Sequence, residues 1–180
     1  MGDASSQAPE RRGYHHGNLR RALLDAGIAL ARGGGPDAVV LREATRRAGV
    51  VPNAAYRHFA SRHVLLQAVR SASLVELARA MEKELGRMSN SLTPADRARA
   101  SLRAIGIAYL RFARNQPGLF RTAFAVPRDP QVADGADTAG HSGLNPFQLL
   151  GLALDRMVEA GVLPAAQREG PNSFATSAYC

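Results

Sequence analysis

Hydrophobic side chains recur along this chain at the three- and four-residue spacing of α-helices, beginning close to the N-terminus. The first apolar stripe consists of Leu19, Leu23, Ala26 and Leu30. Asn18 is a suitable N-cap for this stripe, and the run Gly33-Gly34-Gly35-Pro36 is a strong helix stop. The pattern therefore predicts a first helix from Asn18 to about Gly33.

Three further helices are predicted in the next part of the chain. The second spans about 41–48 and is followed by Gly49, a residue that tolerates positive φ in a tight turn. Pro52 fits the first position of a third helix over 52–59. Ser61 is a suitable N-cap for a fourth helix. The side chains expected to be buried in the third helix are Ala55, Tyr56 and Phe59.

The second half of the chain keeps the helical pattern. Thr93-Pro94-Ala95-Asp96 resembles a capping box, and the helix that it opens is predicted to end at Asn115. A short helix is predicted after Pro117, and a last one over 147–163. The Gly- and Pro-rich stretch 126–146 shows no period and is expected to be a flexible loop. No stretch alternates at period two, so the fold class predicted is all-α.

The charge of the chain concerns its partners more than its fold. The net charge is +8, and residues 1–70 alone carry 11 Arg against 5 acidic residues, a net charge of +6. Such a balance is typical of proteins that bind nucleic acid, an anionic membrane surface or an acidic protein. All but one of the 23 basic residues are Arg, and the exception is Lys83. Arginine suits phosphate and guanine because its planar guanidinium donates two parallel hydrogen bonds.

Several function classes lack their sequence signatures. Cys180 is the single cysteine, so neither a disulfide within the chain nor a cysteine-based zinc site is expected. No HExxH, GxSxG or phosphate-binding glycine loop occurs, which argues against an enzyme and gives no candidate catalytic residue, metal ligand or cofactor. The longest apolar runs are too short to cross a bilayer, and the first residues lack the apolar segment that a signal peptide has. We therefore expect a cytoplasmic protein that does not enter the membrane.

The two short helices joined at Gly49 form the arrangement of a helix-turn-helix, with the motif at about 40–59. The third helix must bury one face and leave the other polar for the major groove. Asn53 is suited to adenine, and Arg57 to guanine or a phosphate. Tyr56, His58 and Arg62 are better placed for backbone phosphates, which set register rather than sequence. Charge runs usually face water, so a solvated surface is favoured over base contact for Arg42, Arg46 and Arg47.

The stretch Leu41-Arg-Glu-Ala-Thr-Arg-Arg-Ala-Gly-Val-Val-Pro-Asn-Ala-Ala-Tyr-Arg-His-Phe59 resembles the TetR/AcrR-type transcriptional regulators. Gly13-Tyr-His-His-Gly-Asn-Leu19 and Phe112-Ala-Arg-Asn-Gln-Pro-Gly-Leu-Phe120 are similar to one branch of that family. The resemblance implies a three-helix DNA-binding domain followed by a helical regulatory domain with a small-molecule pocket. It also implies a homodimer on a pseudo-palindromic DNA operator, and usually repression that an effector relieves.

These expectations divide the chain into a flexible N-terminal arm (1–17), a helix-turn-helix domain (18–63) and a helical domain for ligand binding and dimerisation (64–180). The last residues, 172–180, look like the first turns of another helix cut short, so the C-terminal end is expected to be truncated or divergent. The residues expected to contact DNA are Arg42, Val51, Pro52, Asn53, Ala54, Tyr56, Arg57, His58 and Arg62. Neither the effector nor the residues of its pocket can be named from the sequence.

The sequence departs from the family pattern at Val40, Val51, His63 and Thr45, the last of which replaces the usual Ala at the contact between the two helices, and two other functions stay open. Val40 and Val51 stand where the family usually has Ser or Thr caps, which predicts a less stable helix-turn-helix. His63 replaces a usual acid and adds to the basic character of this part of the chain. The alternatives to a DNA-binding regulator are a basic helical module for membranes or acidic proteins, and an enzyme whose site only the fold would show.

Overall fold

The computed structural model describes residues 16–89, 91–130 and 138–164, and the side chains from residue 19 onward. Every regular element in these ranges is helical, so the all-α prediction is confirmed. The elements are α1 (His16–Gly34), η1 (Pro36–Ala38), α2 (Leu41–Ala48), α3 (Pro52–Tyr56), α4 (Arg62–Leu85), α5 (Pro94–Asn115), α6 (Pro117–Ala125) and α7 (Pro146–Glu159). Residues 1–15 of the expected N-terminal arm and the C-terminal residues 165–180 lie outside the described residues, whereas His16 and Gly17, the last two residues of that arm, belong to α1.

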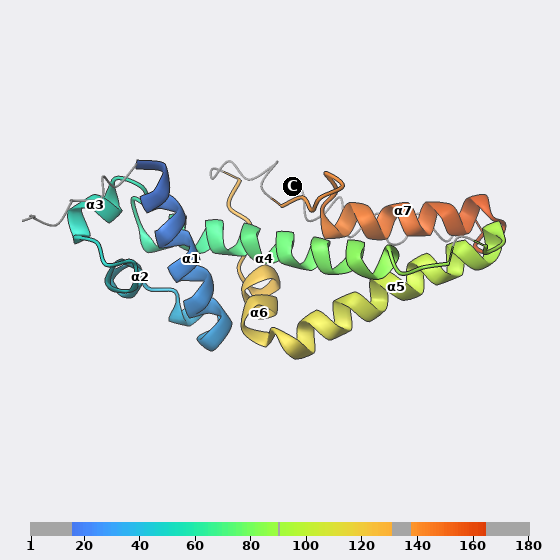
Figure 1. The fold of residues 1–180 in the computed structure, drawn as a ribbon, viewed down its shortest axis with the longest axis horizontal. Coiled ribbons are helices and arrows are strands. Elements are labelled where there is room, and N and C mark those ends of the chain that lie inside the picture. The colour runs from blue at the N-terminus through green and yellow to red at the C-terminus, as the bar shows by residue number, and fades with distance from the viewer. Residues whose placement is uncertain (1–15, 90, 131–137, 165–180) are drawn as a thin grey trace, which may run out of the picture.

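Helix α4 runs lengthwise through the molecule and organises the other elements (Figure 1). Helices α1, α2 and α3 gather at its N-terminal end, while α5 and α7 lie along its other part. Helix α6 sits between the two groups and contacts α1, α4 and α5. We call α1–α3 the head and α5–α7 with most of α4 the body.

The head has a small hydrophobic core beneath α2 and α3. Leu23 of α1, Ala44 of α2 and Ala55 of α3 are fully buried, and Phe59 is buried with them just before α4. The guanidinium carbon of Arg20 lies 5.2 Å from the centre of the Phe59 ring, which shields the ring by a cation–π contact. The packing fixes how α2 and α3 lie relative to α1.

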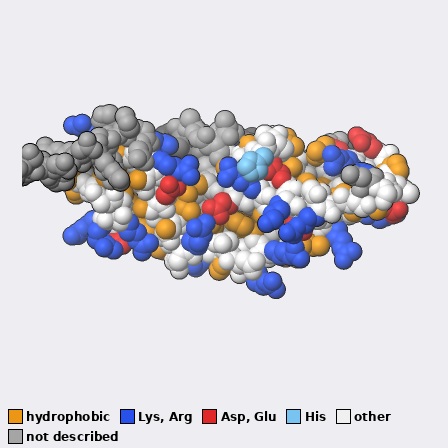
Figure 2. All heavy atoms as spheres, in the orientation of Figure 1, with side chains coloured by type: hydrophobic (Ala, Val, Ile, Leu, Met, Phe, Trp, Pro, Cys, Tyr) orange, Lys and Arg blue, Asp and Glu red, His pale blue; other side chains and the backbone are white. Residues whose placement is uncertain are grey.

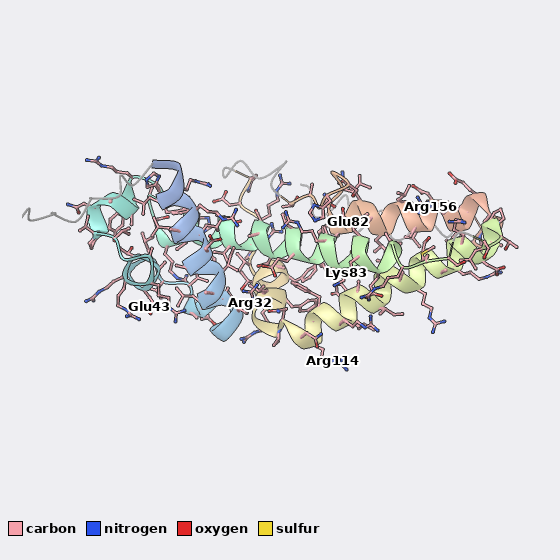
Figure 3. All side chains as sticks on the ribbon, viewed as in Figure 1. Arg32, Glu43, Glu82, Lys83, Arg114 and Arg156 are labelled. Carbon is pink, nitrogen blue, oxygen red and sulfur yellow. The ribbon has the colours of Figure 1, made fainter. Side chains whose placement is uncertain are left out.

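The head and the body meet where α6 crosses the end of α1. Gly118, near the start of α6, lies so close to α1 that a Cβ there would overlap the carbonyl oxygen of Ala31 and come within 2.7 Å of that of Arg32. Arg32 also binds both carboxylate oxygens of Glu76 on α4, at 2.9 and 3.0 Å. Its Nε donates to Oε1 of Gln116, between α5 and α6, at 3.0 Å. Arg32, which Figure 3 labels, therefore links the head to α4 and to the junction of α5 and α6.

A second set of contacts joins the start of α4 to the segment after α6. Gln67 donates to the carbonyl of Pro127 at 2.9 Å, and Arg70 donates to the carbonyl of Val126 at 3.0 Å. His63 Nε2 lies 2.7 Å from a carboxylate oxygen of Asp129. His63, which was expected to add to the basic character of this part of the chain, is thus paired with an acid of the body.

Three helix boundaries differ from those predicted. Helix α1 begins at His16, so Asn18 lies within its first turn and is not the cap; the preceding polar residues carry no apolar signal that could mark the start. Helix α3 ends at Tyr56, because the amides of His58 and Phe59 both bond to the carbonyl of Ala55 in a tight turn. Helix α7 ends at Glu159, where Gly161 turns the chain with φ 66°.

The stretch 126–146 was expected to be a flexible loop, and the structure describes only part of it. Residues 131–137 lie outside the described part, whereas residues 140–144 fold onto α4. Glu82 accepts hydrogen bonds from the amides of His141 and Ser142 and from the Ser142 hydroxyl. Burial opposes ionisation of Glu82, but these hydrogen bonds outweigh it and lower the pKa of the carboxyl. The bonds place the chain so that a capping box at Asn145 and Gln148 starts α7.

Candidate nucleic-acid interface

The turn between α2 and α3 has the geometry that its sequence predicts. Gly49 adopts φ 67° and ψ 32°, the left-handed conformation that a residue with a side chain rarely adopts, and its amide caps α2 by bonding to the carbonyl of Arg46. Thr45 is buried at the contact, and its hydroxyl donates to the carbonyl of Leu41 at 2.7 Å. The buried polar group is thus satisfied within α2, and a hydroxyl is tolerated at this position.

Both helices of the motif begin without a side-chain cap. Val40 precedes α2 and Val51 precedes α3, each with an extended backbone suited to an N-cap but no oxygen to accept a hydrogen bond. The first amides of α3 therefore have no capping partner from the Val51 side chain. The motif is held by its core rather than by its caps.

Replacing Val51 with serine should stabilise the protein by about 1 kcal/mol, because a hydroxyl there can accept from the amide of Asn53 or Ala54. A gain of this size should raise the melting temperature by about 2–4 °C. The matched control is Val51→Ala, which removes the same apolar side chain and provides no acceptor. Equal melting temperatures for the two variants would show that capping does not limit the stability of this motif.

One face of α3 is open to solvent and carries the predicted DNA contacts. Val51 is 67% exposed and Tyr56 is 56% exposed. The prediction that Tyr56 is buried beside Ala55 and Phe59 is wrong for Tyr56, because α3 ends there and only the other two turn into the core. The remaining exposed or half-buried members of the predicted set on this segment are Pro52, Asn53, Ala54, Arg57 and His58.

The arginines of the motif divide into paired and unpaired groups. Arg46 donates to both carboxylate oxygens of Glu43, at 2.9 and 2.7 Å, and Arg47 donates to the same carboxylate at 3.1 Å. Hydrogen bonds from Arg46 and Arg47 lower the pKa of Glu43 to about 2, so the carboxylate is ionised at neutral pH. Arg42 and Arg57 are exposed and form no ion pair or hydrogen bond with the side chains described in the structure.

Arg62 occupies a different position from the other predicted contacts. Its Nε donates to the carbonyl of Val39 at 2.7 Å, and a terminal nitrogen donates to the carbonyl of Pro36 at 2.9 Å. The side chain thus ties the first turn of α4 to the segment that leads into α2. Because a guanidinium has five N–H groups, these two bonds leave others able to donate.

A hollow of about 640 Å³ lies between α2 and the start of α3, and it brings in residues that were not among the predicted DNA contacts. Val40 and Arg46 line it together with Arg42, Glu43 and Pro52. An exposed valine directly before a helix is the one sequence signal that could have pointed to this hollow. Figure 2 shows basic side chains gathered at this end of the molecule.

The chemistry of the described residues offers little else at this site. Among residues 16–89, 91–130 and 138–164, no cluster of three or more His, Cys, Asp or Glu side chains is arranged to hold a metal ion. Over the same ranges, no helix is both long and apolar enough to span a membrane. What the motif presents is hydrogen-bond donors, cationic groups and exposed apolar contacts on one short helix.

Comparisons with known proteins match both halves of the chain. Residues 23–69 match the family of bacterial regulatory proteins, tetR family, and residues 102–175 match a tetracyclin repressor-like C-terminal domain. No curated protein matched the sequence. Among solved structures, a protein with unknown function from Rhodococcus sp. RHA1 is similar, with 26% sequence identity and a TM-score of 0.58. That alignment covers 94% of this chain and 81% of the other.

The two matched regions coincide with the two parts of the fold. The N-terminal match contains the α2–turn–α3 motif, and the C-terminal match begins within α5 and includes α6 and α7. The chain belongs to the TetR family and is a DNA-binding transcriptional regulator.

Proposed function

We propose that this regulator is a ligand-responsive repressor that binds a pseudo-palindromic operator as a homodimer. The observation that carries the proposal is the exposed face of α3, where Asn53 and Arg57 lie beside the solvent-exposed Val51. Side chains of these types recognise adenine, guanine and the methyl group of thymine in the major groove. We place its action in the cytoplasm, where bacterial operators lie.

Each exposed side chain of the motif has a role that its chemistry supports. Asn53 and Arg57 make the base contacts, and Tyr56 and His58 contact phosphates through their polar tips. Val51, Pro52 and Ala54 supply the apolar contacts of the same surface. Arg42, on α2, contacts the DNA backbone. Arg62 contacts a DNA phosphate while its other N–H groups donate to the segment before α2.

The size of the site and the surface of α7 support the homodimer. One helix-turn-helix contacts too few bases to select a single site in a genome, whereas two copies on neighbouring half-sites multiply the specificity. The exposed side chains of α7 include Phe147, Leu150 and Leu152, which are apolar. Phe147 and Leu150 are three residues apart and therefore neighbours on the helix surface, and exposed apolar neighbours favour an interface with a second copy.

Glu43 sets how strongly the motif attracts DNA of any sequence. Replacing Glu43 with glutamine should strengthen binding to random duplex DNA several-fold, because it removes the negative charge that pairs with Arg46 and Arg47. The slope of log K against log salt should steepen by about one. Fluorescence anisotropy over a salt series measures both quantities.

The control for Glu43 is Glu159→Gln, which makes the same change of charge at the end of α7, far from the motif. If both variants strengthen binding equally, net charge alone acts and the paired arginines do not face DNA. If neither changes the slope, the hollow between α2 and α3 lies outside the contact.

The proposed function is tested by footprinting together with the stoichiometry of the complex. We expect two protected half-sites about one helical turn apart and two chains per duplex. A single protected half-site with one chain bound would contradict the homodimer. Equal affinity for every duplex would contradict a sequence-specific regulator. It would favour the alternative function, a basic module that binds polyanions without regard to sequence.

A further inference from the structure

A groove of about 240 Å³ lies between α4 and α5 on the body, away from the helix-turn-helix. Its apolar part is formed by Ala80, Ala108 and Phe112, and its charged part by Lys83, Glu84, Arg87 and Arg111. Figure 3 labels Lys83 on α4, and Figure 2 shows basic side chains over the region where α4 and α5 lie next to each other. An apolar floor beneath cationic groups is a surface that an anion with an apolar body fits.

The charges of the groove are not balanced. Glu84 accepts from Arg87 at 2.6 Å and from Arg111 at 2.8 Å, and both bonds fall on the same oxygen, Oε1. Lys83 is exposed and has no hydrogen bond or ion pair with any side chain in the described ranges. One carboxylate therefore faces three cations, which leaves an excess of two positive charges beside an apolar floor.

The preference for cations at the C-terminal ends of helices explains only part of this positive charge. Lys83 lies in the last turn of α4 and Arg87 just beyond it, where cations are favoured by the helix dipole. Arg111 comes from the other helix, one turn before the end of α5, and the dipole effect fades beyond the last turn. Arg111 nevertheless reaches across to Glu84. The three cations are thus brought together by the packing of α4 on α5.

Lysine is itself unusual in this chain. All 22 other basic residues are arginine, and the single lysine lies in this groove. A compact ammonium group can approach an oxyanion as a point charge, whereas the two arginines are already oriented by Glu84. An anion bound between Lys83 and the two guanidiniums would complete their hydrogen bonding.

We propose that this groove binds a small organic anion whose carboxylate or phosphate group is held by Lys83, Arg87 and Arg111. The apolar body of the ligand packs on Phe112. The shared chemistry of the two head groups is an oxyanion, and the probes below distinguish them.

The far end of the groove reaches the joint between body and head. Gln116 lines the groove, and its side-chain oxygen accepts the bond from Arg32 of α1. Pro117 follows directly and begins α6, and Gly118 after it lies against the end of α1. An anion in the groove thus lies beside the contact that holds the head. That it acts as the effector rests on the proposed function; that it binds does not.

Binding is tested without DNA by titrating the full chain with phenylphosphate and with phenylacetate, followed by calorimetry. Inorganic phosphate and benzyl alcohol serve as the fragments that lack the apolar body or the charge. Reductive methylation with isotope-labelled formaldehyde keeps the charge of Lys83 and gives it a resolved nuclear magnetic resonance signal. We expect at least one aromatic anion to bind more tightly than both fragments and to shift the Lys83 signal.

Three variants test whether the charges of the groove set the affinity for the aromatic anion. Lys83→Gln should weaken binding of the aromatic anion by about tenfold, since a hydrogen bond to a charged group is lost. Glu84→Gln should strengthen it several-fold, because the competing carboxylate is removed while the side chain keeps its shape. The control Arg103→Gln changes an exposed arginine of α5 outside the groove and should leave binding unchanged. Melting curves establish that each variant is folded.

Binding of phenylphosphate but not phenylacetate identifies a phosphate ligand, and the reverse identifies a carboxylate ligand; either supports the site. Binding of neither anion overturns it. So does benzyl alcohol binding as tightly as the anions, or an equal loss of binding in Arg103→Gln. If the anion binds but the protein selects no DNA sequence, the groove stands and the proposed function fails.

Discussion

Replacing Gly118 with alanine should lower the melting temperature by roughly 6–12 °C, which is the largest stability effect that we expect from a single methyl group in this protein. The added Cβ would overlap the carbonyl oxygen of Ala31 and meet that of Arg32 at 2.7 Å. Both obstacles are backbone atoms of α1, so no side-chain rotation can relieve them. Overpacking of this kind costs about 3 kcal/mol.

The matched control is Gly106→Ala on α5, where a Cβ would meet no atom within 4 Å. Because glycine disfavours a helix interior, this change should raise stability by about 0.5–1 kcal/mol. Circular dichroism melting of the two variants gives opposite signs if the contact between α6 and α1 is as close as described. A Gly118→Ala variant as stable as the original chain would show that α6 does not press on α1.

Replacing Arg57 with alanine should weaken binding to the operator by roughly 5- to 150-fold, the range expected for one bidentate contact to guanine. Arg57 is exposed at the end of α3 and forms no ion pair with the side chains described around it. Its loss should therefore leave the fold and the melting temperature nearly unchanged. Anisotropy with operator and random duplexes measures the effect.

The pattern of the loss tells which group Arg57 contacts. If the operator alone loses affinity, the contact is to a base; if all sequences lose affinity and the salt slope flattens by about one, it is to a phosphate. The control is Arg79→Ala, an exposed arginine on α4 at a distance from α3. Equal losses for Arg57→Ala and Arg79→Ala would remove Arg57 from the interface.

The helix-turn-helix could be predicted from the sequence because its determinants are local. Gly49 marks the left-handed turn, Pro52 marks the start of α3, and Ala55 and Phe59 are buried as their helical spacing predicts. The same applies to the caps at Ser61 and Thr93, which lie within one turn of the amides that they bind. Such signals can be recognised from the sequence because they do not depend on the tertiary structure.

What could not be predicted depends on contacts between distant residues. Arg62 donates to backbone carbonyls that precede α2, and Arg32 binds Glu76 and Gln116. These partners are far away in the sequence, so a helical pattern cannot reveal them. Tyr56 follows Ala55 in a run that looks buried, yet the helix ends at Tyr56 and leaves its ring in solvent. The groove beside Lys83 exists only because α5 packs along α4.

Selection of bound duplexes from a random DNA pool, using the full chain, tests most directly whether the exposed face of α3 recognises a DNA sequence. We predict enrichment of one pseudo-palindrome with two half-sites about one helical turn apart. The Arg57→Ala variant should select a sequence relaxed at one position of each half-site, if Arg57 contacts a base. A pool that stays random after selection, with binding that depends on salt alone, would contradict this account.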